Sequence, residues 1–464
     1  MRKKLLTIFV FTSILTSVNA QLLSEDFSNG VPNTWGLNNA DGKTAHPSLN
    51  QTYGSGAAEL WTTTAWIGFT NGTIASTSWY NPVGAADDWI ATPGIAVTTQ
   101  SHLIWDAMSG NPSILEGYEI RISTTAQSPM TEANYPTVLR TVSAESATMN
   151  SKTESLSAFA GQTIYIAFRN NTNNKWTLFL DNISVVNLPP NDVRITAAKV
   201  SQKYVNTPTE VIVSGNYFNA GANPITSLAV NWTDGVNSYT TNIAGLNVAP
   251  LSSGSFTHST QLPIPAIGSY SIKVSVNLTG DVDQSNDTLT TVSYFLATAP
   301  TKIVVGEERT GSWCGACPRG AVGLANMESQ SDFIGIAVHN GDPMAITNYD
   351  NALNTFIPPS FPGAGIDRVV QGDPNSTELL SMHNARKNAI VPAGINSITA
   401  EFNSETNLIS VSTEAQFYGN ITGEFRLSCV IIEDDLSSNA SGWNQSNYYA
   451  NGQLGNMAFP NGIN

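Results

Sequence analysis

The chain has 464 residues, which at ~150 residues per domain suggests about three domains. Its 35 acidic side chains outnumber its 20 basic ones, the formal net charge is -15, and only 12% of the residues are charged. Because affinity for phosphates needs clustered Lys and Arg, this balance excludes nucleic acid as a partner. Low charge combined with 41% hydrophobic residues favours extracellular β-rich modules with neutral polar surfaces.

The N-terminus has the pattern of a secretory signal peptide over residues 1–20. Three basic residues at positions 2–4 precede an apolar run over 5–18, and a small-residue cleavage site ends at Ala20. The run is shorter than the ~20 apolar residues of a membrane-spanning helix, and no later segment approaches that length. We therefore expect an exported protein, secreted or at the cell surface, with no transmembrane segment.

Two proline-bearing seams, at residues 188–191 and 297–300, predict domain boundaries. They delimit a first segment, 21–187, and a middle segment, 191–297. In both, apolar and polar side chains alternate with period two, which predicts half-buried antiparallel strands. The apolar positions are Tyr118, Ile120 and Ile122, then Ile164, Ile166 and Phe168, and, in the middle segment, Tyr270, Ile272, Val274, Val276 and Leu278. Each segment is expected to form a β-sandwich, the middle one of immunoglobulin-like size without the usual cysteine pair.

The first segment resembles a known family at its opening, residues 23–35, and at the later landmarks 87–93 and 180–183. These stretches are similar to the cleaved adhesin domains carried by gingipain-type proteases. The resemblance implies a jelly-roll sandwich over 21–187, related to MAM-type and carbohydrate-binding modules and without a catalytic centre. It implies a carbohydrate or protein ligand. Trp61, Trp66 and Trp79 are candidates for stacking on a sugar, and the alternative places them in the core.

The same resemblance implies calcium in the loop after the opening strand. The candidate ligands are Glu25, Asp41 and Asp181, since calcium prefers hard oxygen ligands. Lys43 stands where the family has an aspartate, and its positive charge opposes a bound cation. The alternative is that the three acids cap turns and strand ends.

The third segment combines strand and helix patterns. Residues 302–308 and 333–339 have strand patterns on either side of a helix that ends near Met327, which predicts a βαβ unit with parallel strands. A second helix is predicted over 376–388. The β-rich extension over 371–464 has strand patterns at 398–402, 408–417 and 425–432, and Cys429 on the last is expected to be a buried small hydrophobe.

Cys314 and Cys317 form a Cys-x-x-Cys turn at the start of the predicted helix. The unpaired amides and partial positive charge of a helix N-terminus favour the thiolate of Cys314, and Cys317 is placed to resolve a mixed disulfide. Glu308, on the preceding strand, is a candidate buried carboxylate that exchanges protons with Cys317. The alternatives are a metal half-site or idle thiols for the pair, and an exposed strand-end acid for Glu308. A zinc site needs four ligands, and no second pair is present.

Residues 307–320, 339–344 and 361–368 resemble the thioredoxin-like domain of a bacterial outer-membrane protein family, the one named for its twenty-eight-kilodalton member. The resemblance implies a thioredoxin-like domain over 300–370 and an outer-membrane association. It also implies a cis Pro362 beside the cysteine pair, with the backbone of Phe361 offered to a bound peptide. A disulfide-bearing protein is the implied substrate.

The sequence therefore predicts a multidomain, mainly β protein: a jelly roll, an immunoglobulin-like sandwich, and an α/β thioredoxin-like domain with appended strands. Its predicted function joins an adhesin-like binding module to thiol–disulfide exchange, with Cys314 as nucleophile and Cys317 as resolving cysteine. The alternative is a non-enzymatic surface adhesin or a structural outer-membrane-associated protein in which the thioredoxin fold is only a scaffold. Residues 451–464 supply no closing strand, which is the pattern of a truncated chain.

Overall fold

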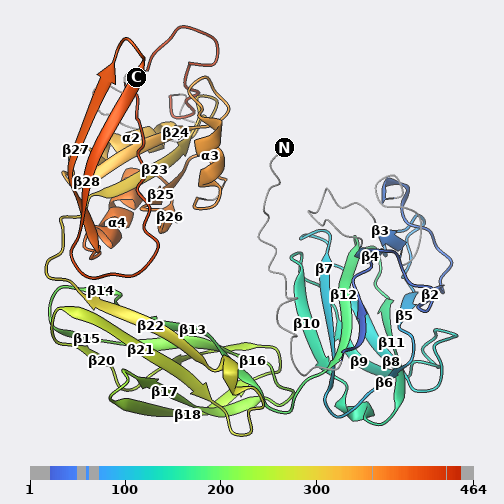
Figure 1. Ribbon diagram of the computed structural model, residues 1–464. Helices are drawn as coiled ribbons and strands as arrows, with labels where there is room; N and C mark the ends of the chain where they lie inside the picture. Colours follow the sequence, from blue (N-terminus) through green and yellow to red (C-terminus); the bar gives the residue numbers. More distant parts are fainter. Residues whose placement is uncertain (1–20, 50–58, 62–72, 358, 435, 451–464) are drawn as a thin grey trace. The chain divides into compact units, whose positions relative to one another are not determined.

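The computed structural model describes residues 21–49, 59–61, 73–357, 359–434 and 436–450 (Figure 1). The predicted signal peptide, 1–20, and the stretch 451–464 lie outside the described residues. The described chain is mainly β, which confirms that part of the predicted fold class. No helix in the described part of the chain is long and apolar enough to cross a membrane.

The chain divides into two compact units. The first unit comprises Met1–Lys199, Val213–Thr260 and Ile272–Thr291, and the second comprises Val200–Ile212, Gln261–Ser271 and Val292–Asn464. The segment predicted as a middle domain, 191–297, contributes to both units, and the predicted domain boundaries stay predictions.

Two antiparallel sheets form a sandwich in the N-terminal part of the first unit, blue and teal in Figure 1. One sheet has the order β10-β7-β12-β4-β3, with β1 beside β12. Its strands are β1 (Gln21–Glu25), β3 (Glu59–Trp61), β4 (Thr73–Ser76), β7 (Ser101–Ser109), β10 (Asn150–Ser155) and β12 (Leu178–Asn187). The other has the order β2-β5-β11-β8-β9, with β6 beside β11. Its strands are β2 (Gly36–Asn39), β5 (Asp88–Ala91), β6 (Ile95–Ala96), β8 (Tyr118–Ser123), β9 (Thr137–Val142) and β11 (Thr163–Asn170).

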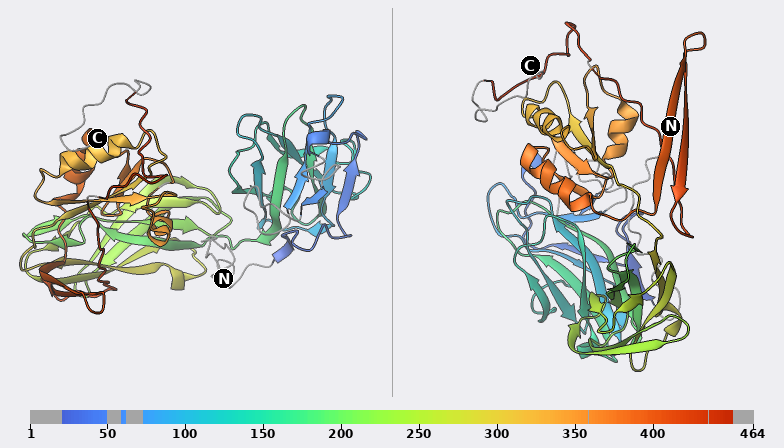
Figure 2. Two further views of the ribbon diagram at one scale, coloured as in Figure 1. Left: turned by 90° about the horizontal axis from the view of Figure 1, so that it is seen from above. Right: turned by 90° about the vertical axis from the view of Figure 1, so that its left-hand side faces the viewer.

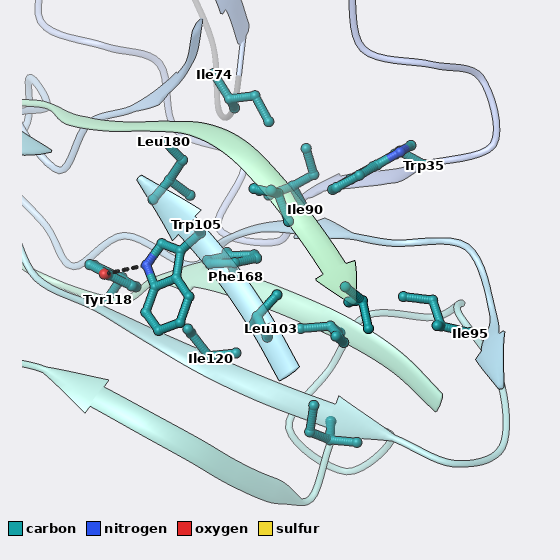
Figure 3. Close-up of a cluster of buried hydrophobic side chains, with 14 of the residues drawn as sticks. Trp35, Ile74, Ile90, Ile95, Leu103, Trp105, Tyr118, Ile120, Phe168 and Leu180 are labelled. Atoms are coloured by element: carbon teal, nitrogen blue, oxygen red, sulfur yellow. Dashed lines mark hydrogen bonds between the residues drawn. The ribbon is translucent and has the colours of Figure 1, made fainter. Parts of the chain in front are cut away.

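The core of this sandwich is built from the alternating apolar residues that the sequence predicts. Ile120 of β8 and Ile166 of β11 are fully buried, and they belong to one cluster with Leu103 of β7. Figure 3 shows the Trp105 indole within the cluster, where its Nε1 donates to the Tyr118 hydroxyl at 2.9 Å. That hydroxyl donates in turn to Glu145 at 3.0 Å, so the polar atoms of these buried rings are satisfied.

The strands of the middle segment lie in both units. The strands β13 (Val193–Val200), β16 (Val213–Asn219) and β19 (Ser253–Thr257) form one sheet, and β17 (Ile225–Thr233) pairs with β18 (Ser238–Val248) and β21 (Gly268–Asn277). The strand β14 (Tyr204–Val205) runs parallel to β22 (Thr288–Phe295), and β15 (Thr209–Val211) pairs with β20 (Leu262–Ile264). The predicted alternation is confirmed on β21, where Ile272, Val274 and Val276 are buried.

The C-terminal part of the second unit contains a four-stranded sheet with the order β24-β23-β25-β26. The strands β23 (Val304–Thr310) and β24 (Phe333–His339) are parallel and are joined through α2 (Pro318–Met327), which confirms the predicted βαβ unit. The strands β25 (Gly363–Ile366) and β26 (Val370–Gly372) are antiparallel to their neighbours. Two more helices are α3 (Thr347–Leu353), which the sequence analysis missed, and α4 (Ser376–Arg386).

A two-stranded hairpin, β27 (Ala393–Asn403) with β28 (Leu408–Phe417), follows α4 and stands apart from the four-stranded sheet (Figure 2). The third strand predicted here is wrong, because residues 424–434 are not in a strand. Cys429 is correspondingly exposed, not buried. The physical reason is that apolar alternation marks residues able to enter a sheet, whereas a strand also needs a neighbour with free backbone groups.

The core assignment predicts that Ile120→Ala lowers the free energy of unfolding of the N-terminal sandwich by about 2–5 kcal/mol, because it leaves a cavity between the sheets. Val138→Ala on β9 is the matched control, since Val138 is 42% exposed and its truncation should cost less than about 0.5 kcal/mol. Chemical denaturation followed by tryptophan fluorescence measures both. Equal losses would contradict the placement of the core.

Candidate functional site

Cys314 and Cys317 are joined by a disulfide at the start of α2. Cys317 is the N-cap residue of the helix and Pro318 follows it in the first turn, where a missing amide hydrogen costs nothing. The Cys317 amide donates to the Cys314 carbonyl at 3.1 Å, which closes the turn. Once the disulfide is reduced, the partial positive charge of the helix N-terminus favours the thiolate form of Cys314.

Three separate stretches of chain surround the turn. Trp313 is 50% exposed, its Nε1 donates to the Asn340 carbonyl at 2.6 Å, and its ring lies 5.1 Å from that of Phe361. The peptide bond between Phe361 and Pro362 is cis. The Arg309 guanidinium lies 4.8 Å from the centre of the Phe361 ring, so this ring is held from β23 as well.

Glu308 lies buried on β23 beneath α2. Only 1% of it is exposed, and its Oε1 atom has no hydrogen-bond partner among the described residues. A Cβ atom at Gly320 would lie 1.9 Å from that Oε1, so the carboxyl group faces the helix three residues after Cys317. The alternative of an exposed strand-end acid is thereby excluded for Glu308.

Burial first, and then the nearby Asp373 carboxylate, raise the pKa of Glu308 to about 8, while a hydrogen bond with the Thr310 side chain and the charge of Arg319 oppose the rise. At neutral pH the group is therefore a protonated carboxyl in a water-poor position. Such a group can donate a proton to a thiolate that forms on the same face of α2.

The preceding residue, Glu307, is equally buried but fully paired. Its two carboxylate oxygens accept from the Arg368 guanidinium at 2.7 and 2.8 Å, and Oε1 also accepts from the Tyr349 hydroxyl at 2.6 Å. Successive residues of a strand point to opposite faces, so Glu307 faces α3 while Glu308 faces α2. The contrast leaves Glu308 as the carboxyl that is free to exchange a proton.

Sequence reasoning missed the polar groups that hold the turn. Asp342 accepts from the Ser312 amide at 2.8 Å and contacts His339 Nδ1 at 2.7 Å. Arg309 is paired with buried Asp350 at 2.9 Å. These partners come from segments about thirty to forty residues away, and no local pattern marks them.

The three calcium candidates are placed differently. Glu25 and Asp181 lie on the paired strands β1 and β12, whereas Asp41 lies in the loop after β2. Each accepts a backbone N–H one or two residues ahead, as the capping alternative expects. The described residues include no group of three or more His, Cys, Asp or Glu arranged to hold a metal ion.

Asp41 also forms an ion pair with a lysine of the same loop. The Lys43 ammonium lies 3.6 Å from the Asp41 carboxylate and donates to the Ala85 carbonyl at 2.9 Å. Asp181 instead lies near Asp26 and Asp106, and burial first, then these two acids, raise its pKa to about 7. Calcium at these residues therefore stays a prediction.

Of the three tryptophans proposed to stack on a sugar, only Trp79 has a described side chain. Trp66 and the side chain of Trp61 lie outside the described residues. The Trp79 ring is stacked with His46 at 4.2 Å and with Trp176 at 4.7 Å. Two rings this close and nearly parallel to a third must lie on its opposite faces, so Trp79 has no free face for a sugar.

Comparisons with known proteins give a weak likeness. No family model matches the chain, and no curated protein matches it. The K3 cleaved adhesin domain of Lys-gingipain from Porphyromonas gingivalis is 21% identical, with 36% of this chain and 99% of that chain covered and a TM-score of 0.28. The K1 domain of the same protein is 21% identical over 36% and 98%, with a TM-score of 0.29. The CARDB domain of a Pyrococcus furiosus protein is 15% identical over 24% and 100%, with a TM-score of 0.20.

The first prediction from this site concerns the proton on Glu308. A difference infrared spectrum, wild type minus Glu308→Gln, should show a protonated carboxyl at pH 7 that titrates away near pH 8. Glu328→Gln, at an exposed position after α2, is the control and should leave the protonated-carboxyl band of the wild type unchanged.

The same shift has a consequence for stability. The native carboxyl keeps its proton up to about pH 8, whereas the unfolded chain loses it near 4.5, so the free energy of unfolding falls as pH rises between these values. The contribution is at most about 1.4 kcal/mol per pH unit. A pH profile of stability that Glu308→Gln does not flatten would contradict the burial of a protonated carboxyl at this position.

The calcium prediction is tested by the melting temperature. Added calcium should raise the Tm of the N-terminal sandwich, by the equivalent of about 2.7 kcal/mol at a hundredfold excess over Kd, and a chelator should reverse the rise. Lys43→Ala, which removes the ammonium from Asp41, should enlarge the rise. No shift at millimolar calcium in either protein would leave the three acids as caps.

Proposed function

We propose that this protein is an exported, surface-associated binding protein whose C-terminal unit carries out thiol–disulfide exchange through Cys314 and Cys317. The observation that carries the proposal is the disulfide at the N-terminus of α2 together with the buried Glu308 carboxyl beneath the same helix, whose Oε1 atom has no hydrogen-bond partner among the described residues. One feature favours a thiolate and the other supplies a proton, and exchange requires both.

We assign residues 300–370 to a thioredoxin-like domain. The support is the parallel pair β23 and β24 joined through α2, with the cis Phe361–Pro362 bond just before β25. The Phe361 ring contacts Trp313, which directly precedes Cys314. This arrangement supports a role for Phe361 and Pro362 at the place where a substrate polypeptide meets the cysteine pair.

The exchange step proceeds from the disulfide. A thiolate of a protein dithiol attacks Sγ of Cys314, so that a mixed disulfide forms while the Cys314–Cys317 bond breaks. Cys317 leaves as a thiolate and takes the proton of Glu308. The second thiolate of the substrate then attacks the substrate sulfur that is bonded to Cys314. This closes the substrate disulfide and releases Cys314 as a thiolate. The substrate dithiol is oxidised to a disulfide, and the cysteine pair is left as the Cys314 thiolate and the Cys317 thiol. Glu308 regains its proton from water, and the reverse sequence reduces a substrate disulfide.

A second candidate function is a surface adhesin in which this fold serves only as a scaffold. It is favoured by the burial of both cysteines, of which 5% and 1% are exposed. The ligand of the first sandwich is proposed to be a carbohydrate or a protein. It does not stack on Trp79, because both faces of that ring are covered by other rings.

The two candidates are separated by turnover on a protein disulfide with a small dithiol as reductant. Wild type should exceed Cys314→Ser by at least about a hundredfold, because a serine hydroxyl cannot form the mixed disulfide. Cys429→Ser is the matched control, since Cys429 is exposed and unpaired and its loss should leave turnover unchanged. Equal rates for wild type and Cys314→Ser would contradict exchange and support the scaffold.

A further inference from the structure

Residues 442–449, which we name the cover segment, lie across the Cys-x-x-Cys turn. The Ser446 amide donates to the Ser312 carbonyl at 2.7 Å, and the Tyr448 amide donates to the Gly315 carbonyl at 2.9 Å. The two donating amides are two residues apart and the two accepting carbonyls are three residues apart, so the backbone of the cover segment is bound to the turn at two points. It therefore takes the backbone acceptors that the turn would offer to a bound peptide.

Side chains add to this pairing from both directions. The Gln445 amide group donates to the carbonyls of Cys314 and Gly311 at 2.9 and 3.3 Å. The Ser312 hydroxyl donates to the Gly442 carbonyl at 2.7 Å. Farther along, the Arg319 guanidinium on α2 donates to the Tyr449 hydroxyl at 3.3 Å. The contacts thus follow the turn from the residue before Trp313 into the helix.

An aromatic ring closes the arrangement over Gly315. A Cβ atom at Gly315 would lie 2.4–2.6 Å from three atoms of the Tyr448 ring, so the ring occupies the space of a missing side chain. The glycine between the two cysteines is therefore needed for close packing of an aromatic group.

The cysteines of the disulfide are largely buried. Exchange requires a thiolate to approach one sulfur along the S–S axis, and Cys314 is only 5% exposed. A pocket of about 380 Å³ remains beside it, between Trp313 and Asp342 on one side and Asn444 and Gln445 on the other. The pocket shows where a substrate has room to begin displacing the cover segment.

We infer that the cover segment stands in for an extended substrate polypeptide and blocks exchange at Cys314 until such a polypeptide displaces it. This rests on the proposed thiol–disulfide exchange. The substrate class follows from the contacts: an extended stretch of polypeptide with two amides to replace those of Ser446 and Tyr448, and an aromatic side chain to replace the ring on Gly315.

The test uses the full chain and the rate at which a small dithiol reduces the Cys314–Cys317 disulfide, read by trapping the thiols formed. The double variant Gln445→Ala with Tyr448→Ala should be reduced about tenfold faster than wild type, since it loses two side-chain hydrogen bonds and the ring contact. Phe402→Ala, at an exposed position of the hairpin, is the control and should match wild type. An unchanged or slower rate in the double variant would overturn the inference.

A second measurement guards against a variant that merely loosens the fold. A peptide with the sequence of residues 442–450, Gly-Trp-Asn-Gln-Ser-Asn-Tyr-Tyr-Ala, should slow the reduction of the double variant back toward the wild-type rate. The same peptide with Ala for the first Tyr should not. Failure of both peptides would attribute the faster reduction to loosening and overturn the inference.

The outcomes also separate this inference from the proposed function. If the double variant is reduced faster but no form of the protein turns over protein substrates, the blocking role of the cover segment would be supported and the proposed exchange activity would be rejected. If wild type and the double variant turn over a protein substrate at equal rates, and the small dithiol reduces both at equal rates, the proposed exchange activity would be supported and the blocking role of the cover segment would be rejected.

Discussion

The burial beneath α2 of a carboxyl with one unpartnered oxygen, Oε1 of Glu308, is the constraint on which the C-terminal site depends. The Glu308 carboxyl can lie against α2 only because residue 320 is a glycine with no side chain. A buried carboxyl with one unpartnered oxygen costs free energy, so we propose that it is retained because it performs a task. In the proposed thiol–disulfide exchange, that task is the transfer of a proton to Cys317, which lies three residues before Gly320.

The sheet explains why two adjacent acids have opposite chemistry. Strand geometry directs Glu307 to the face covered by α3 and Glu308 to the face covered by α2. Arg368 and Tyr349 satisfy the first, and no described side chain satisfies Oε1 of the second. A protein that used the fold only as a scaffold would gain stability by pairing or removing Glu308, because nothing structural is gained from leaving its oxygen unpartnered.

Much of the fold follows from patterns within a few residues. Period two places Ile120, Ile166 and Val274 in cores, and the Cys-x-x-Cys spacing places Cys317 at a helix start. Patterns fail where structure depends on distant partners. The apolar stretch 425–432 alternates like a strand, yet Cys429 is exposed because no described strand pairs with it.

The candidate site divides in the same way. Spacing identifies Cys314 and Cys317, and a family resemblance suggests Pro362, but Gln445 and Tyr448 act on the turn across about 130 residues and carry no local signal. Likewise, the acids of the first module attract a calcium prediction by type alone, whereas Lys43 and nearby backbone amides already satisfy Asp41.

The central claim, that Glu308 delivers the proton that lets Cys317 leave, is tested most directly by the pH dependence of exchange. The rate constant for reaction with a protein dithiol, expressed per substrate thiolate, should fall above about pH 8 in wild type as Glu308 loses its proton. In Glu308→Gln it should be lower and level across the same range. Identical profiles for the two proteins would contradict the account.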